Sequence, residues 1–212
     1  MPDESLLGCR LDEYYLHTVL GSGLYATVYR AARAGSGGEF VVKVFPGDLS
    51  PDRFFVPRLK REVLDLSRFE HPGIVPVLAA GEAEGRPYVV TPLLPGGSLA
   101  ERLAVGPLPL AEAAAVLAQI APALDAAHEQ GLLHRNIKPA NILFDAEGNA
   151  RLADFSLSTV RAALAEWTGV TVAGSAGYTA PELVRGDSRI TRAVDIYALG
   201  VTLFEMLAGR LP

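Results

Sequence analysis

The chain has 212 residues, half of them hydrophobic, and a formal net charge of −5 at pH 7. This composition is typical of a soluble globular protein and excludes a disordered or fibrous one. The mildly acidic balance and the absence of a Lys/Arg run argue against a nucleic-acid partner. Cys9 is the single cysteine, which excludes an intrachain disulfide and fits a reducing compartment.

We expect neither a signal peptide nor a membrane span in this sequence. The N-terminal residues lack both the basic patch and the apolar core of a signal peptide. The most apolar stretch, residues 111–127, is interrupted by Glu112, Gln119, Pro122 and Asp125, so we do not expect it to span a membrane. We therefore expect a cytoplasmic chain without membrane contact.

The first part of the chain is predicted to be rich in β-strands. Runs of β-branched and aromatic residues at 14–20, 27–33 and 39–45 are separated by the Gly-rich segments 21–23 and 35–38. A helix should begin at 50–52, and Pro57 should break it and begin a second helix. One face of that second helix carries Leu59, Glu62, Val63 and Leu66. Two more strands are expected at 74–79 and 87–93.

The segment 95–98, Pro-Gly-Gly-Ser, is predicted to be a linker, and beyond it the chain should be mainly helical. A long Ala-rich helix is expected at about 110–130, with its inner face formed by Leu110, Ala114, Leu117, Ile120, Ala121 and Leu124. Short strands at 142–144 and 150–152 should flank the turn 145–148. The apolar residues within 156–180 recur with neither a helix nor a strand period, which indicates a long surface segment. A final helix is expected at 194–207.

Three features of the first part are compatible with nucleotide binding, although each also has an ordinary structural explanation. Residues 21–26, Gly-Ser-Gly-Leu-Tyr-Ala, would let backbone N–H groups approach phosphates, but an ordinary hairpin turn is the more common reason for such a segment. Lys43 lies in an apolar strand, where a lysine usually marks a solvated face. Glu62 lies on the apolar helix face, where a carboxylate requires a cationic partner, and Lys43 could supply it.

The decisive segment is residues 134–143, His-Arg-Asn-Ile-Lys-Pro-Ala-Asn-Ile-Leu, because its polar residues are hard to explain by packing. Asp154-Phe155-Ser156, Ala180-Pro181-Glu182 and the stretch 195–200 follow it in order. From residue 14 to the end, this set resembles the protein kinase family, whose members share these motifs. The resemblance implies an α+β, two-lobed kinase fold with an N-terminal extension (1–13), a β-rich N-lobe (14–94) and an α-rich C-lobe (95–212).

The resemblance also implies that the chain binds ATP and Mg²⁺. The phosphates would lie under Gly21, Ser22 and Gly23, with Lys43 contacting them and pairing with Glu62. The adenine would be held by Val28, Val41, Thr91, Pro92, Leu94 and Leu143. Mg²⁺ would be bound by Asn141 and Asp154, whose oxygens are hard donors. Lys138 matches the serine/threonine-type lysine that contacts the transferred phosphoryl group, and Phe155, Leu66 and His134 match the stacked residues that align the lobes.

The sequence departs from the family pattern at functional positions. Asn136 stands where the catalytic aspartate is expected, and an amide cannot accept the substrate's hydroxyl proton. Ser156 replaces the glycine after Asp154-Phe155, and Val41 replaces a small residue and should narrow the adenine pocket. The family's C-lobe continues for several helices beyond residue 212, so we expect the C-lobe to be incomplete in this chain.

These observations leave three functions open. The first is a pseudokinase that binds nucleotide and regulates a protein partner. The second is an active kinase that phosphorylates protein Ser or Thr at a reduced rate. The third, a small-molecule kinase, is disfavoured because residues 177–182 resemble the protein-substrate docking segment. Arg135 also suggests a phosphate on the segment after Asp154, with Thr168 and Thr171 as the best acceptors.

Overall fold

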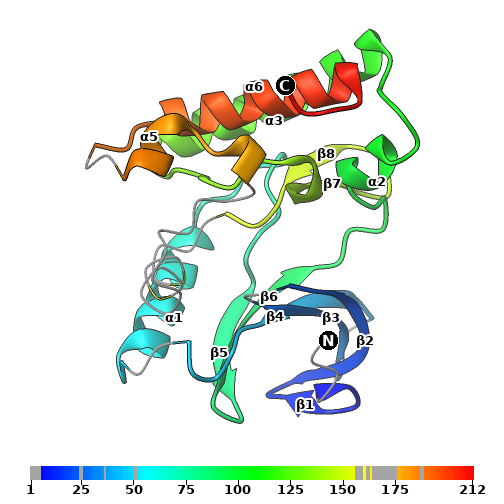
Figure 1. The fold of residues 1–212 in the computed structure, drawn as a ribbon. Coiled ribbons are helices and arrows are strands. Elements are labelled where there is room, and N and C mark those ends of the chain that lie inside the picture. Colours follow the sequence, from blue (N-terminus) through cyan, green and yellow to red (C-terminus); the bar gives the residue numbers. More distant parts are fainter. Residues whose placement is uncertain are drawn as a thin grey trace. The chain divides into compact units, whose positions relative to one another are not determined.

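The computed structural model describes residues 6–23, 26–35, 37–49, 52–155, 160, 163, 176–186 and 189–212 (Figure 1). The chain divides into two compact units. The first contains the described parts of Met1–Phe69, Pro76–Leu93 and Leu157–Val170, and the second those of Glu70–Val75, Leu94–Ser156 and Thr171–Pro212. Each unit is described by itself below.

The first unit is built on a six-stranded antiparallel sheet with the strand order β1-β2-β3-β4-β6-β5. Its strands are β1 (Arg10–Leu11), β2 (Tyr14–Ser22), β3 (Thr27–Arg33), β4 (Glu39–Val44), β5 (Ala79–Ala83) and β6 (Arg86–Pro92). The predicted strands at 14–20, 27–33, 39–45 and 87–93 are confirmed within two residues at each end. Their β-branched and aromatic runs bury alternate side chains, as the two-residue period of a strand requires.

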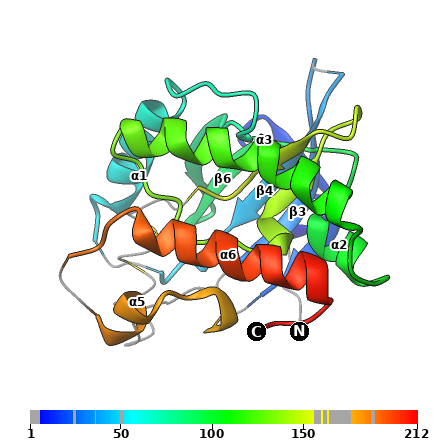
Figure 2. The ribbon, with the colours of Figure 1, turned by 90° about the horizontal axis from the view of Figure 1, so that it is seen from above.

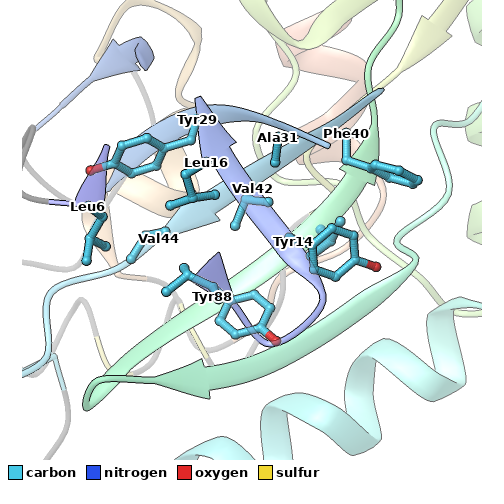
Figure 3. Packing of buried hydrophobic residues seen from close by; sticks show 11 residues of the cluster. Leu6, Tyr14, Leu16, Tyr29, Ala31, Phe40, Val42, Val44 and Tyr88 are labelled. Atoms are coloured by element: carbon cyan, nitrogen blue, oxygen red, sulfur yellow. The ribbon is translucent and has the colours of Figure 1, made fainter. Parts of the chain in front are cut away.

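The core of the first unit lies on one face of this sheet (Figure 3). In β4, Phe40, Val42 and Val44 are buried in it, whereas Val41 and Lys43 alternate onto the opposite face. Tyr14 and Phe40 pack edge to face with ring centroids 5.4 Å apart. The remaining members of the cluster are Leu6, Leu11, Leu16, Tyr29, Ala31, Tyr88 and Val90.

Two predictions for residues 50–79 are wrong. A single helix, α1 (Phe55–Leu66), replaces the two expected around Pro57. Pro57 lies in the first turn of α1, where its missing N–H has no intrahelical acceptor, so it does not break the helix. The expected strand at 74–79 is also misplaced: Ile74 forms only an isolated bridge with Leu152, and β5 begins at Ala79. The face of α1 is as expected, with Leu59 and Val63 buried.

The second unit is mainly helical. Its elements are α2 (Leu99–Leu103), α3 (Leu110–Glu129), η2 (Pro139–Asn141), β7 (Ile142–Phe144), β8 (Ala150–Leu152), η3 (Ala176–Tyr178), α5 (Pro181–Arg185) and α6 (Ala193–Ala208). Helices α3 and α6 lie side by side and run antiparallel (Figure 2). The N–H of Leu108 bonds to the carbonyl of Met206 at 2.7 Å near one end, and His128 contacts Asp195 near the other. The strands β7 and β8 and the helices α3 and α6 occupy the predicted ranges within two residues.

The predicted inner face of α3 is wrong for most of its residues. Ile120 and Leu124 are buried, but Leu110 is 72% exposed. The buried face instead consists of Ala113, Val116, Ile120, Ala123, Leu124 and Ala127. By length and composition, α3 is long and apolar enough to cross a membrane, and in this structure it packs against α6 and β8. On α6, Val201 and Met206 are buried, while Phe204 and Leu207 are exposed.

Candidate active site

Residues 134–141, here called the 134–141 loop, are anchored by a buried carboxylate. Asp195, at the start of α6, is completely buried. It accepts hydrogen bonds from the backbone N–H groups of His134 at 2.9 Å and Arg135 at 2.6 Å, and His128 Nε2 lies 2.8 Å from its Oδ2. A buried carboxylate is stable only when such donors surround it. Asp195 therefore fixes the backbone of the loop relative to α3 and α6.

Two residues of this region have left-handed backbone conformations. Arg135 has φ 59° and Asp154 has φ 63°. Such conformations cost about 1–3 kcal/mol outside glycine and gather at functional sites. Aspartate tolerates them better than most residues, whereas arginine does not. The two N–H bonds to Asp195 hold Arg135 in this conformation. Among the described residues, the buried Arg135 Nε has no hydrogen-bond partner.

Three predicted site residues meet in the second unit. The side-chain amide of Asn136 donates from Nδ2 to Asp154 Oδ2 at 3.2 Å. Asn141 Nδ2 donates to the main-chain oxygen of Asn136 at 2.7 Å, and the main-chain oxygen of Asn141 accepts from the Ala153 N–H at 2.8 Å. The altered base position and both predicted metal ligands thus form one hydrogen-bonded cluster.

The donor set of this cluster fits a magnesium ion. The hydrogen bond from Asn141 Nδ2 fixes the orientation of the amide and leaves its Oδ1 as the acceptor. Asp154 supplies a carboxylate, and Mg²⁺ is usually bound in proteins by one or two such oxygen ligands together with substrate phosphates. Asn141 and Asp154 would hold the ion, which would neutralise charge on bound phosphates.

His134 and Phe155 stack as the resemblance implies. Their ring centroids are 4.5 Å apart at an interplanar angle of 63°, and His134 Nε2 lies 2.9 Å from the Ala153 carbonyl oxygen. Burial lowers the pKa of the His134 imidazole, which favours the neutral ring. The neutral ring can then donate from Nε2 to Ala153. Leu66, the third predicted member, lies half-buried on α1 in the first unit.

The predicted phosphate-binding residues lie in the hairpin of β2 and β3. Gly21 is opposite Val28, and Ser22 is opposite Thr27. The Gly23 N–H closes the turn with a 2.9 Å bond to the Ala26 carbonyl. A hairpin turn is therefore present, and it is compatible with a phosphate-binding role. Residues 24 and 25 of this loop lie outside the described residues.

The other predicted nucleotide residues of the first unit share one sheet. Lys43 on β4 is opposite Val28 on β3 and Val89 on β6, and Val41 is opposite Thr91. Lys43 lies on the face opposite the core, with Nζ 6.0 Å from the Phe45 ring centroid. Pro92 ends β6 opposite Phe40. Glu62 is half-buried on α1.

Leu94 and Leu143, the last two predicted nucleotide residues, belong to the second unit. Leu143 is in β7, opposite Arg151. Lys138 precedes η2, and its carbonyl accepts the Asn141 N–H at 2.9 Å. Ser156, Thr168 and Thr171 lie outside the described residues.

A groove borders Lys138 in the second unit. At one wall of this groove, the hydroxyl group of Tyr178 in η3 donates a hydrogen bond to the carboxylate of Glu205 in α6. Burial and this hydrogen bond raise the pKa of Tyr178, so the phenol stays protonated. The residues that line the groove are Ala100, Leu103, Ala104, Lys138, Pro139, Ala140, Tyr178, Glu205 and Gly209.

Sequence reasoning did not find the roles of Asp195, Tyr178 and Glu205. A signal for Asp195 was present, because an aspartate followed by apolar residues in a helix is unusual unless it is buried and hydrogen-bonded. Tyrosine and glutamate are both common at protein surfaces, so the sequence carried no sign that the side chains of Tyr178 and Glu205 bond to each other.

The model of the protein kinase domain family matches residues 14–212. The chain belongs to the protein kinase family. Among curated relatives, this kinase domain is 37% identical over 209 residues to the serine/threonine-protein kinase PrkC of Bacillus subtilis, covering 98% of this chain and 32% of PrkC. It is 36% identical to PknB of Mycobacterium leprae over 95% of this chain and 33% of PknB. The chain therefore spans about a third of the length of these relatives.

Solved structures show the same fold. The kinase domain of Mycobacterium tuberculosis PknI has a TM-score of 0.77 and 30% identity, with coverage of 97% of this chain and 76% of that one. Rad53, crystallised with AMP-PNP, has a TM-score of 0.76 and 26% identity over 94% of this chain and 49% of that one. The fold is that of a protein kinase, as the motifs predicted.

Proposed function

We propose that this kinase domain binds Mg-ATP, transfers its γ-phosphoryl group to protein Ser or Thr weakly or not at all, and acts by regulating a protein partner. Binding is supported by Lys43, Glu62, Asn141 and Asp154, which are all present at the positions that the family uses for phosphates and metal. We place the contact with the protein partner at the groove beside Lys138, which is lined by residues of α2, η2, η3 and α6.

The observation on which the proposal mainly rests is the hydrogen bond made by the side chain of Asn136. In an active kinase the corresponding aspartate accepts a hydrogen bond from the substrate hydroxyl and takes its proton. Here the side-chain amide is a donor toward Asp154, and an amide nitrogen does not accept a proton. Loss of a general base reduces rates by roughly 10²–10⁴-fold. The expected turnover is therefore far below that of an ordinary kinase.

A second candidate is an active protein serine/threonine kinase, favoured by the retained Lys138, Asn141 and Asp154. The transition state of phosphoryl transfer is loose, so positioning and charge neutralisation contribute more than proton removal. These three residues supply both. A radiolabelled-ATP assay with protein substrates separates the candidates. We expect incorporation near background, whereas turnover at an ordinary kinase rate, about 1–100 per second, would establish the second candidate.

Nucleotide binding itself is tested by thermal melting. A ligand that binds only the folded state stabilises it by RT ln(1 + [L]/Kd), or about 2.7 kcal/mol at a hundredfold excess over Kd. For a chain of this size that corresponds to a rise in melting temperature of roughly 5–10 °C. Lys43→Met should reduce the shift. An unchanged melting temperature in millimolar Mg-ATP would contradict the proposal, and Val41 would then be the first residue to replace with alanine.

A further inference from the structure

The amide of Asn136 occupies part of the predicted metal site. Its Nδ2 donates to Oδ2 of Asp154, 3.2 Å away, and Asp154 is the only carboxylate of the predicted ligand pair. The other ligand, Asn141, is neutral. Carboxylate lone pairs that accept an N–H are not available to a cation at the same time. Mg²⁺ must therefore displace or share this hydrogen bond when it binds Asp154 Oδ2.

The charge at the cluster is also reduced. With an aspartate at residue 136, two carboxylates would face each other where Asn136 and Asp154 now meet, and a cation would be needed to offset their repulsion. Both would also repel the triphosphate of a nucleotide. With Asn136 in place, a hydrogen bond replaces the repulsion between residues 136 and 154. A bound triphosphate would then face one fewer negative charge.

We propose that Asn136 makes nucleotide binding by this chain largely independent of Mg²⁺, because its amide takes the place of a cation at Asp154. The inference rests on the proposed function in requiring that the domain binds ATP. It adds that metal-free ATP is also a ligand. Asn136 thus has two effects: it alters the catalytic position, and it determines whether nucleotide binding requires a metal ion.

The test is the ratio of the ATP dissociation constants without and with Mg²⁺, measured by calorimetry on the purified protein in EDTA and in excess MgCl₂. We expect the ratio to be below about threefold for the wild type. For Asn136→Asp it should be at least about tenfold, because a second carboxylate facing Asp154 would repel it, and would repel the phosphates, unless a cation lies between them. Asn136→Ala, which removes the amide without adding charge, should lie between the two.

Asn149→Asp is a matched control. Asn149 Nδ2 donates to Asp145 Oδ2, also at 3.2 Å, in the turn between β7 and β8. The same chemical change there should leave the ratio at the wild-type value. A thermal melt of each variant in EDTA without nucleotide verifies folding before calorimetry.

Four outcomes would overturn the inference. A wild-type ratio above about tenfold does so without any variant, even if Asn136→Asp does not fold. An Asn136→Ala ratio equal to that of the wild type would show that the amide has no role. Detectable binding only in Mg²⁺ would refute this inference and leave the proposed function intact, whereas no ATP binding under either condition would refute both.

Discussion

At the scale of single residues, the buried Asp195 carboxylate is the contact on which the 134–141 loop depends most. We expect Asp195→Ala to destabilise the protein by on the order of 3–5 kcal/mol, because it leaves the N–H groups of His134 and Arg135 buried without an acceptor. Asp195→Asn should cost less, since one oxygen remains. Urea denaturation followed by circular dichroism measures both. Asp125→Ala on the exposed side of α3 is the control, expected within about 0.5 kcal/mol of the wild type.

The ionisation of Asp145 should make the stability of the folded protein depend on pH. Burial would raise the pKa of its carboxyl, but the Asn149 N–H and the Arg151 guanidinium outweigh this effect and lower the pKa to about 2. Because the unfolded pKa is about 3.9, the ionised group contributes stability above that value. The contribution is lost as the pH falls toward 2.

The measurement is the free energy of unfolding of the wild type and Asp145→Asn between about pH 7 and pH 3. The wild type should be more stable at pH 7, and the difference should shrink as the pH falls below about 5. A difference that stays constant over this range would show that the ionisation of Asp145 does not contribute.

The sequence identified most candidate site residues but few of their contacts. His134, Asn136 and Asn141 were found because polar residues embedded in an apolar segment are hard to explain otherwise, and Asp154 was found through the resemblance to the protein kinase family. The bond from the Asn136 amide to Asp154 was not foreseen, because it joins residues 18 positions apart through two loop conformations that no local pattern encodes. The left-handed φ of Arg135 was not foreseen either, because it depends on a hydrogen bond to Asp195, which is distant in the sequence.

At the scale of elements, Gly96 should be the least tolerant glycine of the 95–98 segment. A Cβ built on Gly96 would lie 2.7 Å from the main-chain oxygens of Phe144 and Asp145, and backbone atoms cannot move aside as a flexible side chain can. The Gly96 N–H also bonds to the Phe144 carbonyl at 2.9 Å, which joins the segment to β7.

We therefore predict that Gly96→Ala destabilises the protein by about 1–3 kcal/mol through overpacking. Gly37→Ala is the matched control, because a Cβ there meets no atom within 4 Å and its φ is not positive. That change should be neutral or slightly stabilising. Equal urea midpoints for the two variants would contradict the packing argument.

Elements whose hydrophobic residues recur with a clear period were predicted well. Elements that form because they pair or pack with another element were not. The sequence of β5, Ala-Ala-Gly-Glu-Ala, has a low strand propensity, yet β5 forms because it pairs with β6 across a turn with positive φ at Glu84 and Gly85. The preceding apolar run looked more like a strand but contains Pro76. The inner face of α3 was misassigned because alanine occupies so much of the helix that several faces are almost equally apolar.

At the scale of the whole molecule, the fold was predictable from the order of the motifs and not from periodicity alone. Strand and helix patterns indicated only a β-rich part followed by an α-rich part, which many folds share. The segment 134–143 and the motifs after it reduced the choice to one family, and the match of the kinase domain model to residues 14–212 confirms it. Function is less determined, and on our proposal the side chain of Asn136 decides between an enzyme and a binding protein.

The most direct test of the account is the rate of phosphoryl transfer by the wild type and by Asn136→Asp, measured with radiolabelled ATP at saturating Mg²⁺. We predict a wild-type rate near background and a recovery of roughly 10²–10⁴-fold in the variant, the factor attributed to a general base. Adding Lys43→Met to the variant should abolish the recovered signal and exclude a contaminating kinase. A wild-type rate equal to that of Asn136→Asp would contradict the account, because the amide at residue 136 would then not limit catalysis.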